Sequence, residues 1–156
     1  MKSFKWNLKC GETYHKPLFS GQHKIIKRIV NGENAVSHSW PFLASIRIII
    51  GNQSEHHCGG TIVSQKHILT AAHCILSYLG LASNLNLTIT GMMHNLMKVK
   101  IGIHDYNTQG DNQYDVIALD FHENFDYSDW TLVNDVMVLT LSRNIELNKP
   151  EVTIVY

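Results

Sequence analysis

Two histidines of this chain are each followed directly by a cysteine, and these side chains could bind a metal, form a disulfide or handle protons. His57 precedes Cys58, and His73 precedes Cys74 at the end of the apolar segment LTAAHC. Histidine and cysteine are the residues that most often bind zinc in proteins. A histidine in an apolar segment can also be a general base, or a core residue whose ring is hydrogen-bonded. The rest of the chain must decide between these roles.

The spacing of these four residues argues against a zinc site. Zinc ligands usually come in pairs separated by two to four residues, whereas immediate neighbours on a strand point to opposite faces. The alternative is a disulfide between Cys58 and Cys74, which would add about 3 kcal/mol of stability in the chain-entropy model in an oxidising compartment. The zinc site remains an alternative interpretation, and we otherwise expect neither a metal nor a cofactor.

The composition is that of a single globular domain without a strong overall charge. The 156 residues include 13 Lys and Arg and 13 Asp and Glu, and 44% of the residues are hydrophobic. A neutral chain has no broad field that would attract nucleic acid or an anionic membrane. No apolar run reaches the roughly 18 residues that a membrane helix needs. We therefore expect no nucleic-acid partner and no membrane span.

Short strands are the elements that must hold the reactive side chains in place. Six segments rich in β-branched and aromatic residues are separated by turn formers, at 41–50, 59–64, 67–71, 98–103, 114–121 and 136–141. This pattern predicts an all-β fold, an antiparallel barrel or sandwich. Alternation at 98–101 predicts a strand with one solvent-facing side, and the nearly uniform apolar run 136–141 predicts deeper burial.

Three other parts of the chain do not have the strand pattern. Residues 71–82 have a helical pattern, and the long connection 75–97 has no structure that the sequence assigns. Residues 1–28 are polar and basic without a sustained period, so we expect an irregular leader before a packed part that starts at Ile29. This leader lacks the apolar stretch of a secretory signal.

The segment CGGTIVSQKHILTAAHC, residues 58–74, closely resembles the histidine region of the trypsin-like (chymotrypsin-family) serine proteases. The similarity is specific because two cysteines, two glycines and one histidine occur at fixed separations. It implies a fold of two antiparallel β-barrels with the active site between them. Residues 29–156 would supply the first of the two barrels only, with the start of the crossover, and His73 would be the general base.

The segment NDVMVLTL, residues 134–141, is similar to the sequence around the family's catalytic aspartate. Six other aspartates lie from Asp105 to Asp129, so position and resemblance, rather than residue type, identify Asp135. A carboxylate at the start of a buried strand can accept the imidazole Nδ1 proton and leave Nε2 free to act as a base. The resemblance thus assigns Asp135 the role of orienting His73.

The segment RIVNGENAVSHSWPFLASI, residues 28–46, resembles the family's activation junction. Cleavage by an activating protease after Arg28 would free Ile29 as a new amino terminus, which in the family pairs with a buried carboxylate. Cys10 and the glycine after it resemble propeptides that stay tethered by a disulfide. The resemblance implies that the partner of Cys10 lies beyond Tyr156.

The family's nucleophile lies in a GDSGG segment, and no serine of this chain has a GDSGG or G-x-S-x-G context. Removing the serine from a triad enzyme costs about six orders of magnitude in turnover. We therefore expect part of a secreted zymogen of a trypsin-like endopeptidase, acting on proteins or peptides and inactive as this chain alone. The alternative is a non-catalytic truncated homologue that binds a protein partner through its exposed lobe face.

Two further expectations concern the surface. Asn52 and Asn86 each begin a glycan acceptor triplet, which acts only on a secreted chain. An extracellular location is what the resemblance implies. The calcium loop of trypsin carries two glutamates, but the corresponding segment 102–113 has Ile103 and Asn112 near those positions. We expect no calcium site there.

Overall fold

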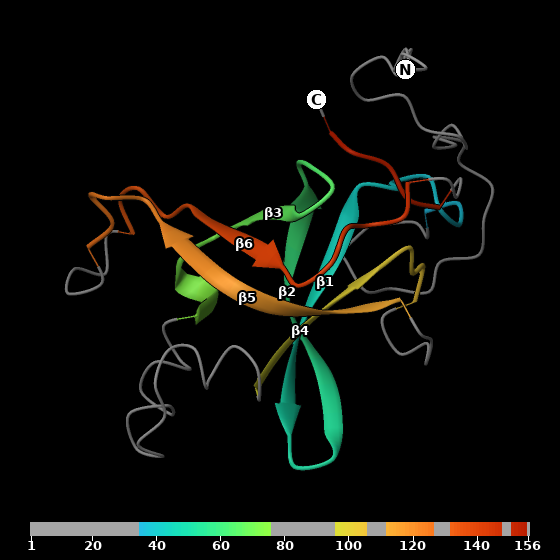
Figure 1. Ribbon diagram of the computed structural model, residues 1–156, viewed down its shortest axis with the longest axis horizontal. Helices are drawn as coiled ribbons and strands as arrows, with labels where there is room; N and C mark the ends of the chain where they lie inside the picture. Colours follow the sequence, from blue (N-terminus) through green and yellow to red (C-terminus); the bar gives the residue numbers. More distant parts are fainter. Residues whose placement is uncertain (1–34, 76–95, 106–111, 127–131, 148–150, 156) are drawn as a thin grey trace.

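The computed structural model describes residues 35–75, 96–105, 112–126, 132–147 and 151–155. In this part of the chain six antiparallel strands form a closed barrel, in the order β1-β2-β3-β6-β5-β4 (Figure 1). The strands are β1 (Leu43–Ile50), β2 (Gln53–Ile62), β3 (His67–Thr70), β4 (Met97–Ile101), β5 (Gln113–Phe121) and β6 (Met137–Leu141). The predicted all-β barrel is confirmed, and each predicted strand segment overlaps one of these strands.

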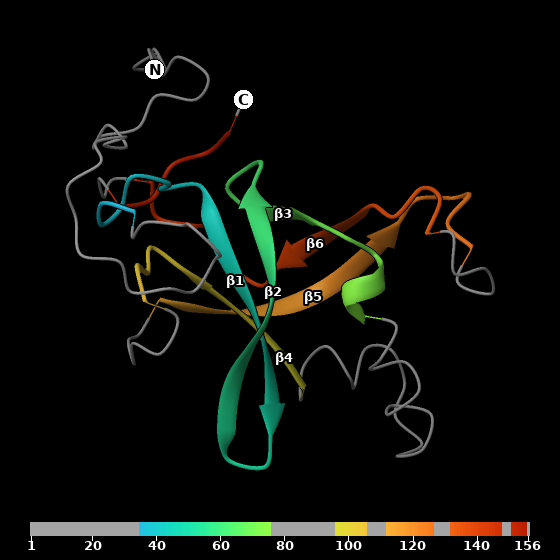
Figure 2. The ribbon, with the colours of Figure 1, turned by 180° about the vertical axis from the view of Figure 1, so that it is seen from behind.

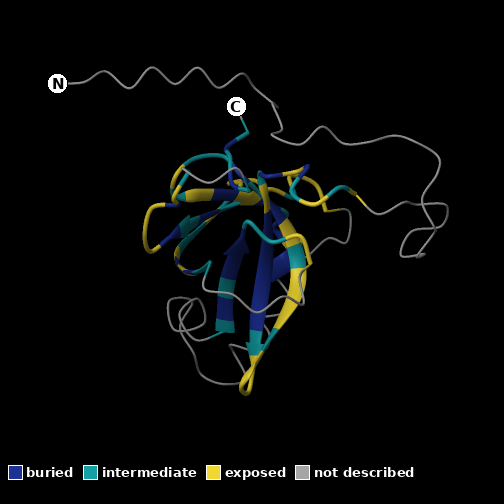
Figure 3. Cartoon of the chain, turned by 90° about the vertical axis from the view of Figure 1, so that its right-hand side faces the viewer, coloured by how far each residue is buried: buried dark blue, intermediate teal, exposed yellow. Residues whose placement is uncertain are grey.

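The barrel forms because alternate side chains of each strand point inward and fill its interior. In β3, for example, Ile68 and Thr70 are buried whereas His67 and Leu69 are exposed. Burying one aliphatic side chain contributes roughly 1.5–3 kcal/mol, so the interior residues supply most of the favourable free energy. Figure 3 shows the buried strand segments inside and the exposed positions around them. The core residues with no exposed surface are Ile46, Ile62, Ile68, Ala72, Ile75, Val99, Val116, Leu139 and Leu141.

Strands β1 and β2 form a long hairpin that projects beyond the rest of the barrel in both Figure 1 and Figure 2. Its loop is Gly51–Asn52, with a φ of 61° at Gly51 and Ile50 paired with Gln53. A two-residue loop with glycine at the first central position is a favoured hairpin connection. Strand β2 therefore begins six residues before the predicted start at 59. The sequence pattern did not predict the first part of β2, because QSEHHC is polar and has no apolar alternation. This segment is a strand because its backbone pairs with β1.

Two expectations about burial were wrong. Lys100 in β4 has only 7% of its surface exposed, although the alternation predicted a solvent-facing position. It lies opposite Ser45 in the neighbouring strand β1, where its long aliphatic stem can pack along the sheet. Val136, which was expected to be deeply buried, is 44% exposed because β6 begins one residue later, and Val138 and Thr140 are half-buried.

The segment with the helical pattern forms one helical turn at 73–75 in its described part. Its remainder, most of the 75–97 connection and the leader 1–28 lie outside the described residues. Within the ranges described above, no helix is both long and apolar enough to cross a membrane.

Candidate active site

His73 lies in the tight turn that follows strand β3. The N–H of Cys74 donates to the carbonyl of Ala71 at 3.3 Å, and the N–H of Ile75 donates to that of Ala72 at 3.1 Å. Ala72, Cys74 and Ile75 are buried, so the residues on either side of His73 in the sequence anchor the turn in the core. The side chain of His73 itself is 49% exposed.

Asp135 lies in the loop that leads into strand β6. Asn134 before it has a φ of 59°, and the N–H of Val136 donates to the carbonyl of Asn134 at 2.7 Å. Asparagine tolerates this left-handed conformation better than most residues. The amide of Asn134 also donates to the carbonyl of Asn124 at 3.0 Å. These contacts set the direction of the Asp135 carboxylate, whose side chain is 19% exposed.

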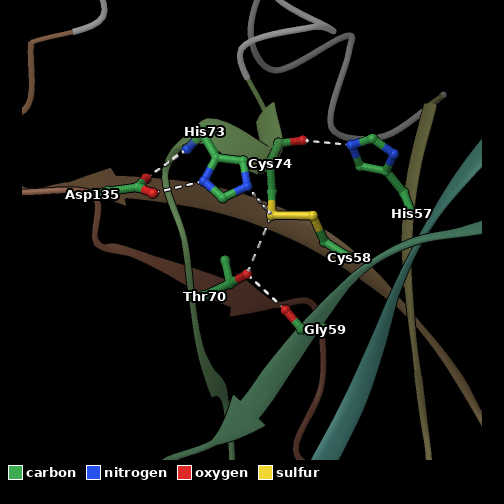
Figure 4. The surroundings of a disulfide bond; sticks show 7 residues. All are labelled: His57, Cys58, Gly59, Thr70, His73, Cys74 and Asp135. Atoms are coloured by element: carbon green, nitrogen blue, oxygen red, sulfur yellow. Dashed lines mark hydrogen bonds and ion pairs between the residues drawn. A yellow bond between two sulfur atoms is a disulfide. The ribbon is translucent and has the colours of Figure 1, made fainter. Parts of the chain in front are cut away.

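The two residues meet through both oxygens of the carboxylate (Figure 4). The backbone N–H of His73 donates to Oδ1 of Asp135 at 2.8 Å, and Nδ1 of the His73 ring lies 2.6 Å from Oδ2. Because an ionised carboxylate can only accept, the ring carries its proton on Nδ1. In the neutral ring this leaves the lone pair on Nε2, which can accept a proton from another group.

The surroundings of Asp135 favour its ionised form. Its partial burial acts to raise the pKa of Asp135, but hydrogen bonds from the ring and backbone of His73, the charge of His73 and a backbone hydrogen bond at Ala72 outweigh it. The pKa of Asp135 is therefore lowered from its usual value. The carboxylate is charged at neutral pH and can stabilise a positive imidazolium next to it.

The predicted disulfide between Cys58 and Cys74 is present. It ties strand β2 to the turn that carries His73. The hydroxyl of Thr70 donates to the carbonyl of Gly59 at 2.8 Å, which adds a second link between the same segments. The turn is therefore held from the side opposite to Asp135.

His57 lies at a bulge, since Ile46 pairs with Cys58 whereas Arg47 pairs with His56. A bulge changes the direction of a side chain, and Nε2 of His57 donates to the carbonyl of Cys74 at 3.1 Å.

The four-residue zinc interpretation does not fit the disulfide-bonded chain, because the two sulfurs are bonded to each other. The spacing argument was wrong in one respect, however. His73 and Cys74 lie in a helical turn rather than a strand, and His73 Nε2 is 3.9 Å from the Cys74 sulfur.

The two glycines after Cys58 have different roles. A Cβ on Gly60 would lie 2.6 Å from Cγ2 of Ile68 and 3.3 Å from the carbonyl oxygen of Leu69, whereas a Cβ on Gly59 would meet nothing within 4 Å. Gly60 therefore permits the close approach of β2 to β3. That approach brings the disulfide and Thr70 next to the histidine turn.

Only one of the remaining predicted site residues lies in the part of the chain that the structure describes. Asn52 is exposed in the loop between β1 and β2, whereas Asn86, Arg28, Ile29 and Cys10 lie outside the described ranges. The absence of calcium at 102–113 stays a prediction. In the described part of the chain, the His73 ring is hydrogen-bonded to Asp135 through Nδ1 and lies 3.9 Å from the Cys74 sulfur at Nε2, and no hydrogen bond joins it to a serine. The sequence analysis did not identify Thr70 or Asn134, whose supporting contacts are tertiary.

The chain is similar in sequence to proteins of known family. The family model described as Trypsin matches residues 29–155. The chain is 28% identical to chymotrypsin-C of Mus musculus over 142 residues, which are 89% of this chain and 44% of that protein. It is 33% identical to granzyme-like protein 2 of Rattus norvegicus over 121 residues, 77% of this chain and 41% of that protein.

A third relative is the clotting factor G beta subunit of Tachypleus tridentatus, with 30% identity over 128 residues, 82% of this chain and 37% of that protein. The chain spans less than half the length of these relatives. The family match extends over the whole barrel and includes both His73 and Asp135. The closed barrel and this match together show that the chain belongs to the trypsin family of serine proteases.

Proposed function

We propose that this chain supplies the first barrel of a trypsin-like serine endopeptidase, in which His73 is the general base and Asp135 orients it. The observation that carries the proposal is the two-point contact between these residues, which are 62 positions apart in the sequence. A single surface ion pair would hold a ring loosely and contribute little. Here one carboxylate holds both the backbone and the ring of His73, and a carboxylate at Nδ1 keeps a general-base histidine in the required tautomer and orientation.

The proposed reaction is the hydrolysis of a peptide bond in a protein or peptide substrate. Nε2 of His73 takes the proton of a serine hydroxyl as the serine oxygen attacks the carbonyl carbon. The positive imidazolium is stabilised by Asp135, and it then gives the proton to the leaving amine nitrogen. Water hydrolyses the acyl-enzyme in a second round of the same proton transfers.

The serine, the oxyanion donors and the specificity pocket would come from polypeptide outside residues 1–156. No serine among these residues lies in a GDSGG context. His73 is accessible to such a group, since nearly half of its side chain is exposed. Three apolar side chains beside Asp135 are also exposed, namely Leu132 at 40%, Val133 at 59% and Val136 at 44%. They would form part of the face against which the second barrel packs.

The proposal includes activation and location. An activating protease would cut after Arg28, so that residues 1–28 are a leader and 29–156 belong to the peptidase domain. The family match, which begins at residue 29, supports this boundary. The disulfide supports an extracellular or otherwise oxidising location, because such bonds persist there. An extracellular chain could carry a glycan on Asn52 or Asn86.

A second candidate function is a non-catalytic protein-binding module. The three exposed apolar side chains around Asp135 favour it, because such a surface can associate with a full-length relative or another protein without any chemistry. In this case the His73–Asp135 contact would only stabilise the barrel.

Covalent labelling separates the two functions. The natural gene product that contains residues 1–156 would be treated with a protease that cuts after Arg28 and then with a fluorophosphonate probe. The peptidase proposal expects labelling of a serine outside these residues, lost with His73→Ala and kept with His67→Ala, an exposed histidine on β3. Cleaved product that stays unlabelled while retaining its far-UV circular dichroism would instead support the binding module.

A further inference from the structure

The disulfide and the candidate general base share one small region of the barrel. The sulfurs of Cys58 and Cys74 and a ring nitrogen of His73 all lie within 4.8 Å of one another. Figure 4 shows that Nε2 of His73 faces the Cys74 sulfur, at 3.9 Å. In the oxidised chain this is only a contact between a ring and a disulfide. The same three atoms are the donor set of a common class of zinc site.

We propose that reduction of the Cys58–Cys74 disulfide converts this cluster into a zinc-binding site, with two thiolates and His73 Nε2 as ligands and a fourth position open to water.

The distances support this without a large rearrangement. Zinc binds thiolate sulfur at about 2.3 Å and imidazole nitrogen at about 2.0–2.1 Å, so tetrahedral ligand atoms lie roughly 3.5–4 Å apart. The Nε2 atom of His73 is already at such a distance from the Cys74 sulfur. Once the S–S bond is broken, the two sulfurs need only separate by a short rotation of their side chains.

The groups around the cluster are those that support a zinc ligand. A histidine that binds zinc through one nitrogen usually donates its other N–H to a carboxylate, which fixes the ring and raises its basicity. Asp135 already holds Nδ1 of His73 in this way. The hydroxyl of Thr70, which donates to the carbonyl of Gly59, lies 4.0 Å from the Cys74 sulfur and keeps a polar group beside the cluster. The exposed side of His73 provides a path for the ion.

The chemistry balances with a dithiol reductant. The dithiol gives two electrons and two protons to the disulfide, becomes a disulfide itself and leaves two protein thiols. Each thiol then releases its proton as it binds Zn²⁺, and neutral His73 contributes the Nε2 lone pair. This lone pair is the one that a general base would use, so zinc and proton transfer exclude each other at His73. The metal site itself does not depend on the proposed peptidase function.

The test uses the 156-residue chain with Cys10→Ser, so that Cys58 and Cys74 are its only thiols. A phosphine reductant opens the disulfide by taking up oxygen from water, and Co²⁺ or Zn²⁺ is then titrated in. We expect one metal ion per reduced chain, sulfur-to-cobalt charge-transfer absorption, and no such signal from the oxidised chain. Far-UV circular dichroism of the metal-bound form should match that of the oxidised barrel.

Variants assign the ligands. The Asp135→Asn change should weaken zinc binding by about 10–100-fold, as loss of a carboxylate partner does at other zinc sites, and His73→Ala should weaken it further. The His67→Ala change is the matched control and should leave the affinity unchanged. Affinity unaltered by His73→Ala, no binding above that of a Cys58→Ser/Cys74→Ser chain, or loss of the barrel on reduction even with excess zinc would each overturn the proposal.

Discussion

Asp135 receives two hydrogen bonds from His73, one from its backbone at 2.8 Å and one from its ring at 2.6 Å. The first bond fixes the turn after β3 relative to the loop before β6, and the second fixes the rotation of the ring. Because both bonds end on one carboxylate, the backbone bond keeps the carboxylate in place, and turning the ring away breaks the bond to Nδ1. The side chain of His73 is thus both half-exposed and oriented, a combination that suits a group that must meet a reactant.

The first prediction concerns catalysis by the natural product after cleavage at Arg28. Replacing His73 with alanine should lower kcat by about 10⁶-fold, because the general base is lost. Asp135→Asn should lower kcat by about 10⁴-fold, since the amide favours the wrong tautomer of the ring. Hydrolysis of a fluorogenic peptide amide measures both effects. The His67→Ala variant serves as control, and activity of His73→Ala close to that of the wild type would reject the assignment.

The second prediction concerns the close approach of β2 and β3. Gly60→Ala should lower the free energy of unfolding by about 1–3 kcal/mol, because the new Cβ collides with the branched side chain of Ile68. Gly59→Ala is the matched control next to it, where a Cβ meets nothing within 4 Å. Urea unfolding of the two variants measures the difference. Equal stability of both would show that the contact with Ile68 is relieved without cost.

The third prediction concerns acid unfolding. The folded state lowers the pKa of Asp135, so its contribution to stability is complete above the ordinary aspartate value of about 3.9 and is lost as the pH falls through the lower folded value. Below pH of about 4, the wild type should therefore lose stability more steeply than Asp135→Asn. Urea midpoints over a series of acidic pH values test this. The control is Asp120→Asn, which removes the same charge at an exposed position of β5 and should lose stability with falling pH as the wild type does. The same loss of stability with falling pH in Asp135→Asn would contradict the prediction.

The fourth prediction concerns the tip of the β1–β2 hairpin. Asn52 is exposed there and is followed by Ser54 at the second position, so a secreted chain should carry a glycan on Asn52. Expression through a eukaryotic secretory pathway should give a glycosidase-sensitive mobility shift that Asn52→Gln reduces by one step. Asn144→Gln, at an exposed asparagine without a hydroxyl residue two positions later, should leave the shift unchanged. A mobility shift of the same size in Asn52→Gln and in the wild type would show that all glycans are on other residues.

Much of the fold could be predicted because the information is local. Alternation of apolar residues, as at Val99 and Ile101, predicts a strand with one inward face, and six short strand segments predict an all-β barrel or sandwich. The predictions of strand bounds and of burial failed where the local sequence pattern disagrees with the pairing between strands. The first half of β2 is polar and becomes a strand only because β1 lies beside it, and Lys100 is buried although its position in the pattern is outward.

For the site, the sequence determined the residue types and the family, through His73, Asp135 and the spacing of the two cysteines. Only the tertiary structure decided which atoms meet. His73 and Asp135 are 62 residues apart, and they come together because β3 and β6 are neighbours in the closed barrel. The approach of the Cys74 sulfur to Nε2 of His73 is local instead, and it follows from the conformation of the chain after Thr70, which is a helical turn rather than a strand. Spacing along a chain predicts proximity only within one regular element, whereas contacts between elements depend on how the barrel closes.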